Sequence, residues 1–231
     1  MTSSGNRWSV TALAASLTLT ACGHPAPATV QAASPPAAPI MSDSATIAKA
    51  RADSLRHPYT EADIYFMSGM IHHHAQAIVM AGWAPSHGAS PQVQTLCRRI
   101  INSQQDEIAT MQRWLSARSQ PVPAATATGM TMKMDGMEHE MLMPGMLTED
   151  QMHQLDQARG TEFDRLFLVL MIQHHRGAIT MVDQLFGSYG AGQDETVFKF
   201  ASDVNVDQST EIVRMEQMLA ALPPAPAQRP S

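Results

Sequence analysis

The sequence predicts an all-α protein in which one helical hairpin occurs twice and the two copies share a core as a four-helix bundle. The segment MIHHHAQAIVM, Met70 to Met80, recurs 101 positions later as MIQHHRGAITM, Met171 to Met181. The segments that follow also correspond, at an offset of 104, so that Val93 to Leu115 matches Val197 to Leu219. Aromatic residues make up only 5% of the chain, which disfavours an extensive sheet. Two hairpins that each need a partner for their apolar face favour a bundle.

The first 21 residues resemble an export signal. Arg7 supplies a positive end, and Trp8 to Leu19 form an apolar core that is too short to span a membrane. The segment ends in Leu-Thr-Ala before Cys22, which resembles a bacterial lipobox, so we expect a lipid on Cys22. The alternative is an ordinary signal peptide that is cut nearby. Because Gly23 follows the cysteine, we expect a lipoprotein on the periplasmic side of a bacterial membrane, with the outer membrane favoured.

Residues 22–57 are rich in Pro and Ala and are expected to be a tether with room for one short helix, near Ser44 to Arg56. Residues 58–222 are expected to form the bundle. Residues 223–231 are again rich in Pro and Ala and are expected to be a disordered tail.

Five helices are expected within the bundle domain, each bounded by capping or breaking residues. Hairpin one (60–118) opens its second helix with Ser90-Pro91, an N-cap followed by proline at the first helical position. A short helix between the hairpins has a capping box in Thr148 and Gln151. Hairpin two covers residues 161–222. The predicted helices are Thr60–Trp83, Ser90–Arg118, Thr148–Ala158, Thr161–Phe186 and Asp194–Leu222.

Polar side chains fall on the apolar stripes of these helices. At 100° per residue, His74 lies in the middle of the apolar face of its helix, His73 lies at the flank and His72 points away. Glu107 lies on the apolar stripe of the next helix, at a height within two helical turns of His74. Burying a carboxylate and an imidazole costs several kcal/mol unless they are paired. We therefore expect these groups to satisfy one another or to bind a metal ion.

The bundle's candidate metal ligands are the His, Met and Glu residues that the two copies share. A hydrogen-bonded polar core is the alternative, and the duplication of both His pairs beside Met and Glu favours a metal. Asp63 and Asp164 are expected either to hydrogen-bond to metal ligands or to act as charges at helix N-termini. Cys97 is expected to be a small buried hydrophobe. The ligand candidates are Met70, His73, His74, Met111, Glu107, Met171, His174, His175, Met215 and Glu211, with Asp63, Asp164, Gln104 and Gln208 as their supporting shell.

A methionine-rich insert, residues 129–146, separates the two hairpins. Seven of the chain's 18 methionines lie in it, many at alternate positions beside Gly, Asp and Lys. Thioethers are soft ligands that favour Cu(I) and Ag(I). We expect the insert to be mobile without metal because it offers no apolar face to dock; the alternative is a low-complexity linker. The accessory ligand candidates are Met130, Met132, Met134, Met137, His139, Met141, Met143 and Met146.

The paired segments FMSGMIHHHAQAIVMA and FDRLFLVLMIQHHRGAITMV, with MPGMLTEDQMHQL between them, resemble the family called domain of unknown function 305. The resemblance covers about residues 58–222. It implies a ferritin-like four-helix bundle and, from exported copper-binding members of the CopM kind, periplasmic binding of copper or silver by His and Met. The positions that match the Met-Ile-x-His-His motif are Met70, His73, His74, Met171, His174 and His175.

The resulting hypothesis is an exported, lipid-anchored protein that sequesters or hands on Cu(I), with silver as a second cargo and no turnover chemistry. Expected partners are copper ions, the membrane and another copper carrier or exporter. A formal charge of −6 without a basic block argues against nucleic acid. One alternative is a di-iron or di-manganese oxidase, although the Glu-x-x-His motif of such centres is missing from the main helices. Another is a structural lipoprotein that binds a protein partner without metal.

Overall fold

The structure is a computed structural model that describes residues 59–134 and 137–224. The predicted export signal, Cys22 with its predicted lipid, the predicted tether and residues 225–231 lie outside the described residues, so these features stay predictions. In the described part of the chain, no helix combines the length and apolar character needed to cross a membrane.

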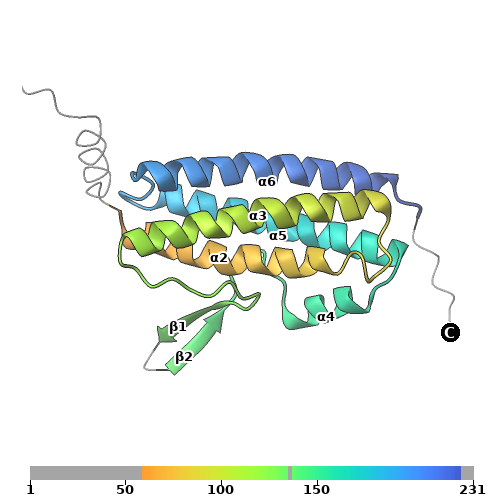
Figure 1. Cartoon of the computed structure of the whole chain (residues 1–231), viewed down its shortest axis with the longest axis horizontal. Coiled ribbons are helices and arrows are strands. Elements are labelled where there is room, and N and C mark those ends of the chain that lie inside the picture. Colours follow the sequence, from red (N-terminus) through yellow and green to blue (C-terminus); the bar gives the residue numbers. More distant parts are fainter. Residues whose placement is uncertain (1–58, 135–136, 225–231) are drawn as a thin grey trace, which may run out of the picture. The chain divides into compact units, whose positions relative to one another are not determined.

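Four long helices run side by side and form the bundle (Figure 1). They are α2 (Glu61–Gly82), α3 (Pro91–Ala117), α5 (Thr161–Gly187) and α6 (Glu195–Ala221). Helix α2 packs against α3, α5 packs against α6, and α2 contacts α5. The predicted all-α fold and all four helices are confirmed, with ends that differ from the prediction by at most one residue.

The helices begin where the sequence supplies a side-chain acceptor for their free N–H groups. Thr60 caps α2 in a reciprocal capping box with Asp63. Ser90 caps α3 by accepting from the Val93 N–H, with Pro91 following at the first helical position as predicted. The Asp194 carboxylate accepts from two N–H groups at the start of α6. Such caps stabilise a helix by about 1 kcal/mol each.

Two aspartates connect the hairpins at opposite ends of the bundle. Asp63, on the first turn of α2, accepts a hydrogen bond of 2.7 Å from the Gly192 N–H, just before α6. Its equivalent in the second copy, Asp164, accepts one of 3.1 Å from the Ser90 N–H, just before α3. The start of each first helix therefore lies beside the loop of the other hairpin, and α2 and α5 are antiparallel.

These bonds correct one of the two roles predicted for Asp63 and Asp164. Asp63 precedes His73 by ten residues, which is about 15 Å along a helix, so it lies too far away to support a ligand there. Asp164 has the same separation from His174. Both act as helix N-terminal charges, the other predicted role, and as acceptors for loop N–H groups.

The segment between the hairpins contains a β-hairpin that the sequence prediction missed, together with the short helix that it predicted. Strands β1 (Met130–Met134) and β2 (Met137–Met141) form an antiparallel hairpin, and the short helix α4 (Glu149–Gln157) starts with the predicted capping box of Thr148 and Gln151. Strand β1 contacts α2, and α4 contacts α5 (Figure 1). We expected residues 129–146 to have no apolar face that could pack against the bundle. This expectation is wrong, because Met143 and Met146 are buried in the core.

The core consists of two hydrophobic clusters. One contains Phe66, Met70 and Met111, and the other contains Phe163, Met171 and Met215. Each equivalent pair of methionines is thus divided between the clusters. Cys97 belongs to the second cluster, where burial raises the pKa of its thiol to about 12, so it is the inert buried hydrophobe that was predicted.

Candidate metal centre

Two equivalent histidines meet where α2 and α5 contact each other. The rings of His73 and His174 have centroids 3.8 Å apart, and both side chains are completely buried. Because these residues occupy the same position in the two copies, their contact places the pseudo-twofold axis of the duplication between them. His73 was predicted at the flank of its helix's apolar face. That flank is the α2–α5 contact, so it is as deeply buried as the middle of the face.

The neighbouring histidines pair with glutamates of their own hairpins. His74 donates from Nε2 to Glu107 at 2.5 Å, and His175 donates from Nε2 to Glu211 at 2.7 Å. The predicted proximity of His74 and Glu107 is confirmed, and the second hairpin repeats it. Both histidines are completely buried, whereas the glutamate side chains are 17% and 25% exposed.

The histidine centre has fewer hydrogen-bond partners than ring nitrogens. His73 donates from Nε2 to the Pro144 carbonyl oxygen at 3.1 Å. Within the described residues, Nδ1 of His73, His74 and His175 has no hydrogen-bond partner, and His174 has none at either ring nitrogen. Each unpaired buried polar atom costs about 1–3 kcal/mol. The centre is therefore stable only because the surrounding bundle holds it in place.

Burial also decides the protonation state of the central pair. The pKa values of His73 and His174 lie well below 6.5, because burial disfavours the charged ring and the neighbouring histidines add repulsion. Since a carbonyl can only accept, His73 must carry its hydrogen on Nε2, which leaves the lone pair on Nδ1. These are the neutral imidazoles with free lone pairs that bind transition metals.

The predicted supporting amides are buried beside the glutamates on the same helical stripes. Neither amide atom of Gln104 has a hydrogen-bond partner in the described part of the chain, and neither does Oε1 of Gln208. His72, predicted to point away from the core, is buried instead. Its Nδ1 lies 3.1 Å from Oγ1 of Thr126, because the segment before β1 covers this side of α2.

An acidic groove between α3 and α6 leads to one of the His–Glu pairs. Its walls include Asp106, Glu107, Asp203 and Asp207, with Lys199 as a basic residue among them. Burial raises the pKa of Asp207, and repulsion from Glu107 and Asp203 raises it further. Glu107 therefore faces His74 on one side and an anionic groove, which attracts cations, on the other.

The arrangement does not form a closed site of the usual kind. Across residues 59–134 and 137–224, no three His, Cys, Asp or Glu side chains converge on one point as they would around a preformed metal ion. Imidazole nitrogens and thioethers are softer ligands than carboxylate oxygens, so these residue types fit a soft metal such as copper or silver better than a hard ion that needs many oxygen ligands.

The β-hairpin has a second set of candidate ligands at matched positions. Its register pairs Met130 with Met141, Met132 with His139 and Met134 with Met137. Since alternate residues of a strand share a face, all six positions fall on one face of the hairpin. Thr131, Lys133, Glu138 and Glu140 occupy the other face. On this face Met137 is 63% exposed, whereas Met130 packs against a core cluster.

The fold and the site define a duplicated four-helix bundle with a buried centre of imidazole, thioether and carboxylate groups. The chain belongs to the family described as Domain of unknown function (DUF305), whose sequence model matches residues 63–219.

Solved structures are similar to the chain over most of their own lengths. A DUF305 fragment from Deinococcus radiodurans is 26% identical, with a TM-score of 0.59 over 71% of this chain and 99% of that one. CopM in its Cu(I)-bound form is 29% identical, with a TM-score of 0.51 over 71% of this chain and 97% of CopM. CopM structures with Cu(II) and with silver are also similar to this chain.

An uncharacterized protein of Acanthamoeba polyphaga mimivirus is 39% identical over 56 residues, which is 24% of this chain. The match spans 37% of the viral protein, so it says little about the activity of the whole.

Three contributions to the centre were missed by sequence reasoning. They are the contact between His73 and His174, the Pro144 carbonyl, and the close approach of the 143–146 turn to α2 and α5. A usable signal existed for the third, because Gly69 and Gly177 interrupt apolar helical stretches. Such glycines often mark close packing.

The central pair should make the metal-free fold sensitive to acid. In the folded protein His73 and His174 remain neutral, whereas in the unfolded chain they bind protons as the pH falls below 6.5. The unfolded state then holds more protons, so the free energy of unfolding decreases as the pH falls, by up to about 2.7 kcal/mol per pH unit for two sites. Urea denaturation of chelator-treated protein between pH 7.5 and 5 measures this slope.

Replacing both histidines, as His73→Leu/His174→Leu, should flatten the slope and leave stability at pH 7.5 equal or higher. His153→Leu, at an exposed position of α4, is the control and should keep the wild-type slope. An unchanged slope in the double variant would show that the pair takes up protons in the folded state.

Proposed function

We propose that this protein binds copper as Cu(I), with Ag(I) as a second cargo, and sequesters it or passes it to another carrier. The observation that carries the proposal is the set of buried ring nitrogens without partners at the α2–α5 contact. An apolar core gains nothing from such groups. A metal ion would bind these nitrogens and so remove the cost of leaving them without hydrogen-bond partners, because neutral imidazoles are metal ligands.

The likeness to CopM supports the choice of metal. CopM has been solved with Cu(I), Cu(II) and silver, and its fold is similar to that of this chain at 29–30% identity. The first ligand candidates are His73, His74, His174 and His175. Glu107 and Glu211 orient two of them, and Met70, Met111, Met171 and Met215 supply thioethers from the two core clusters.

The β-hairpin is proposed as an accessory site for the same ion. Five methionines and one histidine share one of its faces, which is a ligand set for Cu(I) or Ag(I) and a poor one for hard cations. The hairpin would collect the ion at the surface, and the bundle would hold it more rigidly. Both are binding sites, so we propose no catalytic turnover.

The cellular setting follows from the N-terminal sequence alone. A lipid on Cys22 would hold the protein on the periplasmic side of a bacterial membrane, with the tether of residues 22–57 separating the bundle from the lipid. Such an anchor suits exchange of copper with another carrier or an exporter in the same compartment.

Removing the bundle's His–Glu pairs should remove its metal site without unfolding it. His74→Leu/His175→Leu replaces two buried rings by apolar side chains of similar volume, and the partly exposed glutamates can be hydrated. We expect at least a tenfold weaker Cu(I) affinity for the bundle, measured by titration against a competing chelator. His153→Leu is the matched control. If the double variant binds like the wild type, these histidines are core residues only.

The two faces of the β-hairpin allow a matched test of the accessory site. Replacing Met132, Met134, Met137, His139 and Met141 by Thr should lower the number of Cu(I) ions bound, because it removes the soft ligands but keeps strand propensity. Lys133→Thr/Glu138→Thr changes the opposite face and should leave the number unchanged. Equal losses in both variants, or a loss in neither, would contradict the accessory site. Helical content by circular dichroism should stay constant throughout.

The anchor is tested by Cys22→Ala. Without the thiol no lipid can be attached, so the variant should move from the membrane fraction into the soluble exported fraction. Fractionation of cells followed by immunoblotting measures this. A variant that still sediments with membranes would show that the anchor is not a lipid on Cys22.

A further inference from the structure

Helix α4 lies across one end of the α2–α5 pair, outside the four-helix bundle (Figure 1). Its Leu155 is completely buried in the same core cluster as Ala84 and Phe163. Asp156 accepts a hydrogen bond of 3.1 Å from Nε2 of His87, in the loop after α2. The helix therefore bridges the start of α5 and the end of α2.

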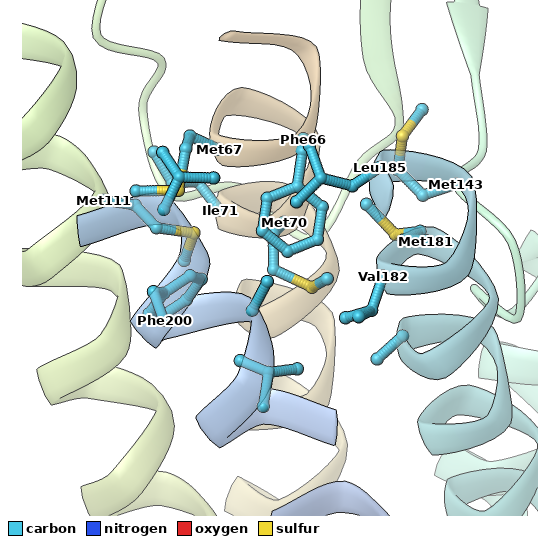
Figure 2. Close-up of a cluster of buried hydrophobic side chains, with 14 of the residues drawn as sticks. Phe66, Met67, Met70, Ile71, Met111, Met143, Met181, Val182, Leu185 and Phe200 are labelled. Atoms are coloured by element: carbon cyan, nitrogen blue, oxygen red, sulfur yellow. The ribbon is translucent and has the colours of Figure 1, made fainter. Parts of the chain in front are cut away.

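The opposite end of the α2–α5 pair has a hollow of about 160 Å³ in the described part of the chain. Figure 2 shows three of its lining residues, Phe66, Met181 and Leu185, together at one side of a core cluster. Tyr65, which also lines the hollow, is 36% exposed. A cavity of about 150 Å³ can hold benzene, so this hollow is large enough for a leucine side chain.

The duplication relates this hollow to the place where α4 docks. The residues at the two ends correspond at the offset of 101 that relates α2 to α5. Four lining residues of the hollow are more exposed than their equivalents: Ala62, Tyr65, Gln184 and Ser188 compared with Phe163, Leu166, Trp83 and His87. Leu166 and Trp83 pack against the cluster that contains Leu155 of α4. The hollow at the start of α2 is therefore equivalent to the place that α4 covers at the start of α5.

The chain has a segment in the matching position to fill this hollow. Residues 44–56, for which the sequence predicts a short helix, lie outside the described residues and precede α2 as α4 precedes α5. Leu55 lies six residues before Glu61, where α2 begins. In the second copy, Leu155 lies six residues before Thr161, where α5 begins. Leu55 is thus the equivalent of the leucine that anchors α4.

The pattern and the position of this segment both suit the hollow. Ala48, Ala52 and Leu55 follow one another at spacings of four and three residues, so they share one face of a helix. This face has one large apolar side chain between small ones, which matches a hollow of limited volume. The described chain begins at Tyr59, three residues before Ala62 of the hollow's wall, so the segment is held close to the hollow.

We infer that the hollow between α2 and α5 is the docking site of residues 44–56, which bind there as a short helix with Leu55 in the hollow. The inference is independent of metal binding and goes beyond the proposed function. Only residues 22–43 then remain as the spacer between the bundle and the predicted lipid on Cys22. The bundle is therefore held closer to the membrane than a tether of residues 22–57 would hold it.

A cysteine cross-link tests the docked position in the full-length protein. Arg56→Cys/Ser188→Cys places thiols at the positions that correspond to Asp156 and His87, whose side chains are in contact in the second copy. Arg56→Cys/Asp183→Cys is the matched control, because Asp183 is an exposed residue of α5 that does not line the hollow. After mild oxidation, peptide mass spectrometry should detect at least tenfold more of the first disulfide than of the second.

Trypsin cleavage, which needs no added cysteine, gives a second measurement. Docking should protect the bond after Arg51, which lies within the segment. Leu55→Asp removes the apolar side chain that fills the hollow and should speed cleavage at this bond at least tenfold. Ile40→Asp, in the tether before the segment, should leave the rate as in the wild type. Helical content by circular dichroism should show that both variants keep the folded bundle.

Equal yields of the two disulfides, or cleavage that Leu55→Asp does not accelerate, would show that residues 44–56 are not docked and would overturn the inference. A disulfide that joins two chains through Ser188→Cys, in place of the internal bridge, would also overturn it. That result would assign the hollow to a second copy of the protein.

Discussion

Four completely buried imidazoles lie side by side at the contact of α2 and α5, and the rest of the structure has to accommodate them. Glutamates from α3 and α6 accept from one ring nitrogen of two of them, a turn carbonyl accepts from one nitrogen of a third, and His174 has no partner among the described residues. Burial keeps the central pair uncharged, and this is the state in which imidazole binds metals. Burying ring nitrogens without hydrogen-bond partners destabilises the metal-free core. Binding of a metal ion to these nitrogens would offset this cost.

The duplication explains both the symmetry of the centre and its one asymmetry. The bonds of Asp63 and Asp164 to opposite loops hold the hairpins antiparallel, so that His73 meets its own equivalent. The 143–146 turn occurs once, and it lies on one face of the α2–α5 pair because Gly177 allows the approach there. The other copy has Gln76 at this position, and its amide binds the Leu147 backbone instead. One side of the centre is thus covered by a methionine-rich turn, while an acidic groove approaches from the other.

Local geometry predicted the helices, the caps at Ser90 and Thr148 and the proximity of His74 and Glu107, because each depends on helical periodicity and on position within one hairpin. The contact of His73 with His174 depends on how two hairpins cross, which periodicity within one helix cannot specify. The alternating methionines of residues 130–134 have the period of a strand, but beside Gly, Asp and Lys they resemble a flexible linker. Docking of Met143 and Met146 required two glycines on other helices, and only the folded chain brings these together.

The most direct test of the central claim is crystallographic. Crystals of the protein loaded with Ag(I) or Cu(I) would locate each metal ion by anomalous scattering. The account predicts an ion in the bundle, bound to at least one ring nitrogen that has no hydrogen-bond partner in the metal-free structure, together with ions on the methionine face of the β-hairpin. Ions bound only outside the bundle, with the four imidazoles unchanged, would contradict it and leave the buried histidines as a structural feature of the core.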